Sequence, residues 1–293
     1  GLVLDELTAR ISGQEVRVSG LLPLEQERLI LLRDDPWFYL RQMGNGKVEI
    51  PDADLSQWTT LAPSALAPSG RLQMSLQVAP GGMIDGAMYL KGAALRPIGP
   101  LGALQDITAE VRFEGRRITI KSVEAQTGGR PVELKGDAQW LESGQPRFDL
   151  SLRGKNLPLI RQTGLLLRGD VDLKLQTDDD GMSWVRGSVG LRDGLFLVDL
   201  ESLRPSSGGG GSVSGRPPYF SVTEKPFADW RLDIAVKGND FLRMETPVFS
   251  GRASADFQLS GTLREPRAIG EAVVTEGLVK LPFATFNVTE GWV

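Results

Sequence analysis

Carboxylates and hydroxyls are the main reactive side chains of this chain, because the sequence contains no cysteine and no histidine. The absence of cysteine removes disulfides, thiolate nucleophiles and thiolate metal ligands together. The absence of histidine removes the commonest metal ligand and the only side chain that ordinarily titrates near neutrality. Hydroxyls such as those of Thr163 and Ser183 therefore have no imidazole to activate them. The sequence favours a protein that is not an enzyme and that uses no cofactor and no metal.

Two short motifs invite an ion-binding or phosphate-binding interpretation, but neither has the full pattern. Residues 178–181, Asp-Asp-Asp-Gly, lack the alternating ligands and the closing glutamate of an EF-hand loop. A charged hairpin tip explains them better. The glycine run 208–211 is not followed by Lys-Ser or Lys-Thr, which a phosphate-binding loop requires. Neither motif predicts a site.

Aspartates are frequent, and many of them lie between small or apolar residues in strand-like segments. Asp137, Asp149, Asp172 and Asp233 are examples. Successive side chains of a strand point to opposite faces, so these carboxylates are expected on a solvated face. Sequence spacing alone identifies no carboxylate pair suited to glycoside cleavage.

Composition and charge exclude several classes of protein. The 293 residues carry a net charge of −4 with acids and bases interspersed, so no basic surface for nucleic acid is expected. No run of 18 apolar residues could span a membrane as a helix, and no secretion signal opens the chain. The sequence starts and stops beside strand-like patterns, and we interpret it as a piece of a longer protein.

Alternation of apolar and polar residues predicts β-strands along most of the chain. Short turn sequences such as Asp193-Gly194 separate the segments, so antiparallel hairpins are expected rather than crossover connections. Helical periodicity is limited to residues 35–43 and 52–62, and residues 206–218 form a Gly/Ser-rich flexible loop. The clearest strand segments are 71–78, 106–113, 116–125, 170–177, 229–238 and 252–261.

A small motif, an apolar residue followed two positions later by glycine, recurs through these strands. Both residues of such a pair face the same side of a sheet. A glycine on the buried side allows a bend or bulge where a side chain would clash. The intervals are irregular, which argues against a fixed-period repeat fold. The copies are Val18–Gly20, Leu90–Gly92, Leu134–Gly136, Leu152–Gly154, Leu167–Gly169, Val236–Gly238 and Leu259–Gly261.

The apolar face of the strands needs a partner, and few helices are available to cover it. A two-sheet sandwich, a closed barrel and a curled trough would each solve this problem. A trough lined with Leu, Val, Ile and Phe suits acyl chains, because each buried methylene is worth about 0.8 kcal/mol. Composition does not choose among the three.

Three motifs in the C-terminal third carry a resemblance to a known family. They are WRLDIAVKG at 230–238, LSGTLREP at 259–266 and GLVKLPF at 277–283. In this order they resemble the C-terminal region of TamB-like proteins, within the AsmA-like group. Residues 107–140 are similar to the looser AsmA-type hairpin repeat, so the resemblance covers about residues 100–293.

The resemblance implies an all-β fold: an elongated, curled antiparallel sheet of U-shaped cross-section (a β-taco) with an apolar groove. At most one or two short helices are expected near the N-terminus. The chain would divide into N-terminal strands at 1–62, a β-repeat region at 63–205, the loop at 206–218 and an incomplete TamB-like β-region at 219–293.

The family further implies a periplasmic protein, anchored in the inner membrane by a segment this sequence lacks. Members of the family are thought to carry phospholipid between the inner and outer membranes, and an outer-membrane β-barrel partner is implied. We therefore predict a lipid-binding groove lined by inward side chains. They are Val111, Phe113, Ile118, Ile120, Phe148, Leu150, Leu152, Val171, Leu173, Leu175, Leu232, Ile234, Val236, Phe257 and Leu259.

Two alternatives stay open at this point. The first is a scaffold whose sheet edge pairs with strands of outer-membrane proteins during their assembly. The second is a sandwich-type carbohydrate-binding protein with aromatic platforms. We interpret the candidate aromatics instead as core anchors or strand-edge plugs. They are Trp140, Trp184, Trp230 and Trp292.

Overall fold

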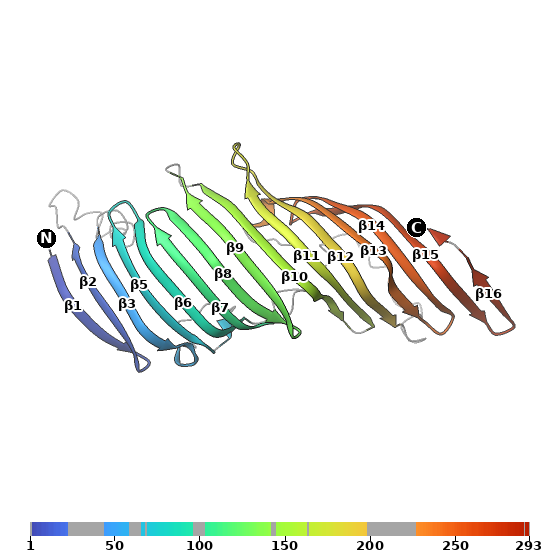
Figure 1. Cartoon of the computed structure of the whole chain (residues 1–293), viewed down its shortest axis with the longest axis horizontal. Coiled ribbons are helices and arrows are strands. Elements are labelled where there is room, and N and C mark those ends of the chain that lie inside the picture. The colour runs from blue at the N-terminus through green and yellow to red at the C-terminus, as the bar shows by residue number, and fades with distance from the viewer. Residues whose placement is uncertain are drawn as a thin grey trace, which may run out of the picture. The chain divides into compact units, whose positions relative to one another are not determined.

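The computed structural model describes residues 2–22, 44–58, 66–67, 69–95, 103–141, 145–162, 164–197, 227–289 and 291–292. These residues form β-strands, turns and two single-turn 3-10 helices (Figure 1), which confirms the predicted all-β class. The chain divides into two compact units. Unit 1 comprises residues 1–96, 103–126 and 133–150, and unit 2 comprises residues 97–102, 127–132 and 151–293.

Unit 1 is an antiparallel sheet whose strands follow one another as hairpins. Its ladders join β1 to β2, β2 to β3, β3 to β5, β5 to β6, β6 to β7 and β7 to β8, and β4 pairs with β6. Three strands, β8 to β10, contribute residues to both units. The bounds are β1 Leu2–Ile11, β2 Gln14–Leu22, β3 Asn45–Asp54, β4 Leu66–Ala67, β5 Arg71–Ala79, β6 Met83–Leu95, β7 Leu104–Glu114, β8 Arg117–Thr127, β9 Arg130–Trp140 and β10 Pro146–Gln162.

Unit 2 continues the pattern with one exception to the expected antiparallel order. β12 and β13 pair in parallel, with Val185 opposite Leu232 and Val189 opposite Val236. A parallel pair needs a connection of a dozen or more residues, and residues 198–226 supply that length. The bounds are β11 Leu165–Thr177, β12 Ser183–Leu197, β13 Arg231–Glu245, β14 Phe249–Gly261, β15 Pro266–Leu281, β16 Ala284–Val288 and β17 Gly291–Trp292.

One of the two predicted helices, at 52–62, is not found as predicted over its described residues. In the described part of the segment 52–62, residues 52–58, strand β3 runs to Asp54 and the 3-10 turn η2, Leu55–Gln57, follows. Residues 52–54 are in a strand rather than a helix because the ladder between β3 and β5 extends to the pair Asp54 and Arg71. A second 3-10 turn, η4 Phe227–Asp229, precedes β13 and was not predicted. The predicted helix 35–43 and the loop 206–218 lie outside the described residues. Within the described ranges, no helix is long and apolar enough to cross a membrane.

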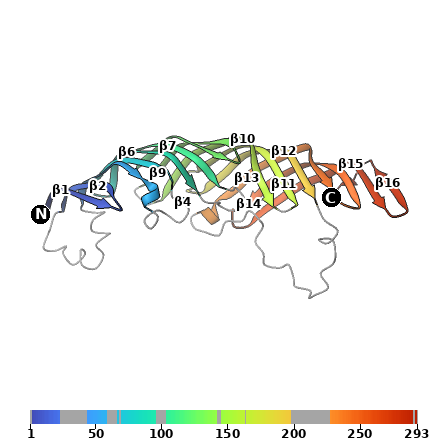
Figure 2. The same ribbon diagram turned by 90° about the horizontal axis from the view of Figure 1, so that it is seen from below.

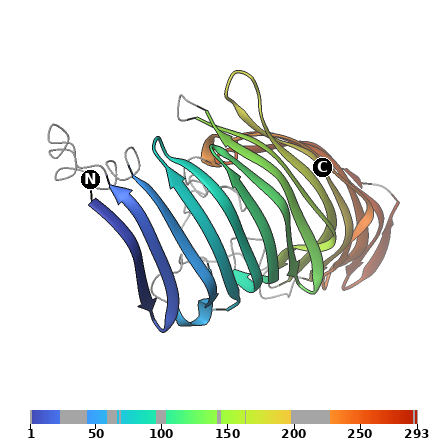
Figure 3. The ribbon, with the colours of Figure 1, turned by 60° about the vertical axis from the view of Figure 1, so that its left-hand side comes forward.

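Lines of bulges bend the strands of each unit. In unit 2 the register shifts at Arg168/Gly169, Gly190/Gly194, Gly238/Leu242 and Arg252/Ala253, at neighbouring positions of successive ladders. Comparable shifts in unit 1 occur on β3, β6 and β7. A bulge bends its strand and increases the local twist. The strands of each unit are accordingly curved along their length (Figure 3).

Bulges also explain several of the recurring glycines. Shifts follow or coincide with Gly92, Gly169 and Gly238, three copies of the apolar-x-glycine motif. At Gly238 an added Cβ would meet the ring of Phe241, which folds back over the glycine and is only 9% exposed. The prediction that buried-side glycines permit bulges is confirmed at Gly169 and Gly238, which are buried, whereas Gly92 is exposed.

Candidate functional site

Cross-strand register places the predicted inward side chains of unit 2 on one face of its sheet. Leu173 lies opposite Gly187, Gly187 opposite Ile234, and Ile234 opposite Leu259. Residues directly opposite each other in a ladder share a face. We call this surface the apolar face of unit 2. Its members are Val171, Leu173, Leu175, Val185, Val189, Leu232, Ile234, Val236, Phe257 and Leu259.

An ion pair fixes the orientation of β10 relative to this face. The guanidinium Nε of Arg153 lies 3.2 Å from Oδ1 of Asp172 on β11. Asp172 alternates with Val171 and Leu173, so both charged residues occupy the opposite, polar face. Leu152 therefore points to the apolar face. Phe148 and Leu150 lie on the same side of strand β10 as Leu152, and all three are half-buried.

Four of the predicted residues that belong to unit 1, those on β7 and β8, also share one face. Val111 lies opposite Ile120, and Phe113 lies opposite Ile118. The ladders extend this surface across β6, β5, β3, β2 and β1. We call it the apolar face of unit 1. Its members are Leu7, Val16, Val18, Val48, Ile50, Leu72, Met74, Leu76, Met88, Leu90, Val111, Phe113, Ile118 and Ile120.

Sequence reasoning missed most of the unit 1 face, although part of it was visible. The alternation at 71–78 already placed Leu72, Met74 and Leu76 on one side of a predicted strand. On β12 of unit 2, sequence reasoning did not identify Val185 and Val189, because Gly187 and Gly190 interrupt the apolar pattern. The extent of both faces depends on the neighbours that each strand acquires, which alternation within one strand does not specify.

The apolar side chains are buried to very different degrees. Val111, Val171, Leu232 and Ile234 are 4–8% exposed, whereas the other predicted groove residues are half-buried. In unit 1, Ala53 and Ala93 beside the bulges have no exposed surface. Bending brings facing side chains together, which is consistent with small residues at these two bulge positions. The arrangement is an extended hydrocarbon surface that is only partly covered by the described residues.

Four glycines on the strands let neighbouring backbones approach closely. At each, φ lies between 133° and 157°, and an added Cβ would overlap a carbonyl oxygen of the adjacent strand. Gly187 of unit 2 is typical, because its Cβ would meet the oxygen of Asp172. Only glycine accepts both this conformation and this contact. The other three are Gly86, Gly136 and Gly270.

The opposite face of each sheet is polar and internally paired. In unit 2, Lys237 Nζ lies 2.8 Å from Asp256 Oδ2, and Gln258 Nε2 donates to Asp233 Oδ1 at 2.6 Å. In unit 1, the Asp137 carboxylate accepts a hydrogen bond from the Thr119 hydroxyl at 2.7 Å. Asp149, Asp172 and Asp233 are exposed, as predicted, and Asp137 is half-buried. Their position on the polar face of the strands explains these carboxylates without a catalytic role.

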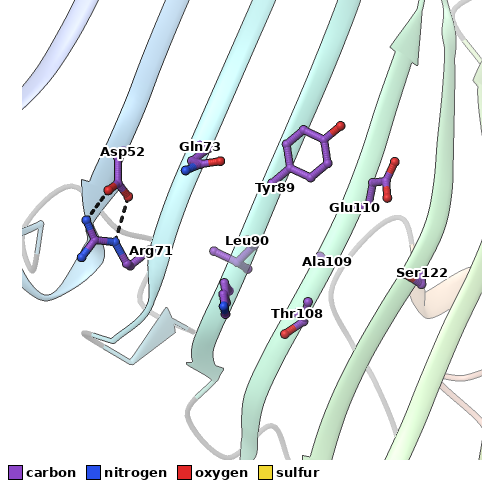
Figure 4. A pocket seen from close by; sticks show the side chains of 10 residues that line it. Asp52, Arg71, Gln73, Tyr89, Leu90, Thr108, Ala109, Glu110 and Ser122 are labelled. Carbon is purple, nitrogen blue, oxygen red and sulfur yellow. Dashed lines mark hydrogen bonds and ion pairs between the residues drawn. The ribbon is translucent and has the colours of Figure 1, made fainter.

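A hollow of about 480 Å³ lies on the side of the unit 1 sheet that carries Asp52, Arg71, Tyr89 and Glu110 (Figure 4). Its carboxylates are already engaged, Asp52 by a bidentate pair with Arg71 and Glu110 by Lys121 Nζ at 2.6 Å. The hydrogen bond from Arg71 lowers the pKa of Asp52, although desolvation opposes the shift. Asp52 is therefore ionised at neutral pH and unsuited to general-acid catalysis.

The predicted roles of the tryptophans are only partly supported. Trp184 lies on the polar face, where the guanidinium carbons of Arg186 and Arg231 stand 4.6 and 5.4 Å from its ring centroid. Arg186 in turn pairs with Asp178 of the 178–181 turn at 3.3 Å. Trp140 is 43% exposed rather than a core anchor. Trp230 packs edge-to-face on Phe227 at 4.9 Å. The Trp292 side chain lies outside the described residues.

Asp170 links the bulges of unit 2 on the polar face. Its carboxylate accepts the backbone N–H of Asn156, at 2.9 Å, and pairs with Arg192 at 2.6 Å. The backbone hydrogen bond first, and then Arg192, lower the pKa of Asp170, against a smaller opposing effect of desolvation. Asn156 needs this support, because it holds a positive φ of 51°.

We expect Asp170→Asn to lower the free energy of unfolding at pH 7 by roughly 0.5–1 kcal/mol, the range of a solvent-screened pair. A carboxyl with a lowered folded-state pKa stabilises the fold above its unfolded pKa, near 4, and loses this effect as the pH falls through the folded value. The difference between variant and parent should therefore shrink between pH 5 and pH 3. Urea unfolding across this range measures it, with exposed Asp193→Asn as the control. A constant difference would contradict the assignment.

Comparison with known proteins gives one match. The family model for the TamB C-terminal domain matches residues 116–291, more than half of the chain. No curated protein and no solved structure matches it. The match spans the apolar face of unit 2 and the last strands of unit 1.

Proposed function

Because the chain belongs to the TamB family, we propose that it carries phospholipids along its apolar faces, as part of a bridge between the inner and outer membranes. Proteins of this family belong to the envelope of Gram-negative bacteria. The periplasm is the proposed location of the strands. For the full-length protein the proposal includes an inner-membrane anchor and an outer-membrane β-barrel partner.

The observation that carries the proposal is the continuity of hydrocarbon side chains across neighbouring strands. In unit 2 the row Leu173, Ile234 and Leu259 and the row Val171, Val236 and Phe257 run across β11 to β14. An acyl chain of 16 carbons gains about 10 kcal/mol from burial before the entropy costs of binding. Branched aliphatic side chains offer no directional contact, so a chain can shift from one row to the next without breaking a specific bond.

Single-layer construction also favours lipid transfer over the carbohydrate alternative. Within each unit the described strands form a single open layer, and the described residues form no second sheet (Figure 2). A sandwich would fill its interior with its own side chains. Here the half-buried Leu173 and Phe257 leave surface for a guest. Movement along such a surface needs no chemical step.

Photo-crosslinking tests this proposal directly. A photoreactive residue at Leu173 or Ile234 should capture radiolabelled phospholipid when the protein is incubated with phosphatidylethanolamine–phosphatidylglycerol vesicles. The same residue at Ser188, exposed on the polar face and opposite Asp172, should capture little. Equal capture at all three positions, or none at Leu173 and Ile234, would contradict lipid carriage.

One observation favours the scaffold alternative and shapes a further control. Residues 266–272 of β15 pair with β14, but the described partners on the other side begin only at Val273. Ile269 in this stretch is 69% exposed. If strand pairing with client proteins were the main activity, a crosslinker at Ile269 would capture protein while Leu173 captured no lipid.

A further inference from the structure

One described element outside the strands packs on the apolar face of unit 1. The turn η2 leaves the end of β3, and the following residue, Trp58, packs against the buried cluster of Val16, Ile50 and Ala53. Partly buried Val18, Val48, Leu72 and Met74 surround the same cluster. The indole therefore occupies surface that belongs to the proposed lipid path.

The start of this turn is fixed by hydrogen bonds and by a buried side chain, whereas the residue at its end is half-buried. At its start, the Asp54 carboxylate accepts the Ser56 N–H at 2.9 Å, Gln14 Oε1 accepts the Asp54 N–H at 2.9 Å, and the Leu55 N–H donates to Gly70 O at 2.9 Å. Leu55 itself is only 6% exposed. These contacts fix the first residue of the turn to β2, β3 and the start of β5.

Trp58, at the other end, is held by two hydrogen bonds. Its backbone N–H donates to Leu55 O at 3.1 Å, and its indole Nε1–H donates to Ile11 O at 2.9 Å, at the end of β1. The side chain is half-buried. Rotation of the Trp58 side chain about χ1 would remove the indole from the cluster and break its bond to Ile11 O, while the backbone hydrogen bonds of the turn stay in place.

We propose that Trp58 is a displaceable stopper, which covers the apolar face of unit 1 beside β1–β5 and yields to acyl chains. The inference rests on the proposed lipid-carrying function. An empty hydrocarbon surface is unfavourable in water, and the indole covers part of it at low cost in ordering. About four methylenes bury as much apolar surface as one such side chain. An acyl chain that reaches Met74 can therefore replace the ring.

The experiment compares lipid capture under the indole with capture in unit 2. A photocrosslinker at Met74, which packs against the same cluster as Trp58, reports lipid at this part of the face, and one at Ile234 is the reference. With the vesicles described above, Trp58→Ala should raise the Met74-to-Ile234 ratio about threefold or more, because a competing occupant is removed. Trp58→Phe keeps a ring but loses the bond to Ile11, so it should give a smaller rise.

The outcomes separate the stopper from the function on which it rests. An unchanged or lower ratio in both variants, with lipid still captured at Ile234, would show that Trp58 is only part of the core. A parallel rise at Gln73, on the polar face, would mean that unit 1 had unfolded and would count equally against the stopper. No lipid at Ile234 in any protein would overturn the proposed function itself.

Discussion

Replacing Gly187 with alanine is expected to destabilise unit 2 by about 3 kcal/mol or more. The residue holds φ at 139°, a conformation that side chains avoid, and its Cβ would overlap the carbonyl oxygen of Asp172. That oxygen belongs to the backbone of the neighbouring strand, so it cannot turn aside. Relief requires β11 and β12 to separate, with loss of ladder hydrogen bonds around Leu173.

Urea unfolding measures the effect, and Gly115→Ala is the matched control. Gly115 also has a positive φ, of 61°, but an added Cβ there meets nothing within 4 Å. Its replacement should cost only about 1 kcal/mol, the conformational term alone. If both variants lost the same stability, close strand approach would not be the reason for glycine at position 187.

Replacing Leu173 with arginine is expected to lower lipid capture at Ile234 by about tenfold or more, because an unpaired charge on a hydrocarbon path is costly to desolvate. Leu173 lies opposite Gly187, and Gly187 lies opposite Ile234, so the arginine would stand in the same row as the reporter. Gly187 offers no side chain to shield it. The measurement is the yield of crosslinked phospholipid.

Ser188→Arg supplies the control for charge and size. Ser188 is exposed on the polar face, opposite Asp172, and its replacement should leave lipid capture unchanged. Leu173→Met preserves apolar volume and should also carry lipid. Capture that survived Leu173→Arg in a folded protein would mean that lipids do not follow this row.

Together these predictions distinguish an exposed lipid path from an ordinary core. If the apolar face were a self-filled core, Leu173→Arg would lower the stability of the protein and Trp58→Ala would not raise lipid capture. If it is a lipid path, Leu173→Arg lowers lipid capture at Ile234, and Trp58→Ala raises lipid capture at Met74. Both readouts use the same crosslinking experiment, at positions in different units of the chain.

Local alternation predicted many of the strands and the faces of their side chains, although residues 52–54 of β3 were predicted to be helical. In the stretch Val171-Asp172-Leu173, each residue lies on the side its polarity predicts, and the same holds for Leu232-Asp233-Ile234. Period-two patterning is written within a single strand, so no knowledge of neighbours is needed to read it. The resemblance carried by residues 230–283 added the family, and the match over 116–291 confirms it.

The tertiary structure decided which strands became neighbours, and with them everything that depends on pairing. The parallel pairing of Val185 with Leu232, the alignment of bulges from Gly169 to Ala253 and the strand contact at Gly187 all involve residues far apart in sequence. Trp58 packs on Ile50 and Val16 because β2 and β3 are adjacent. Alternation along a strand predicts which side most of its residues face, but only the assembled ladders determine what they meet there.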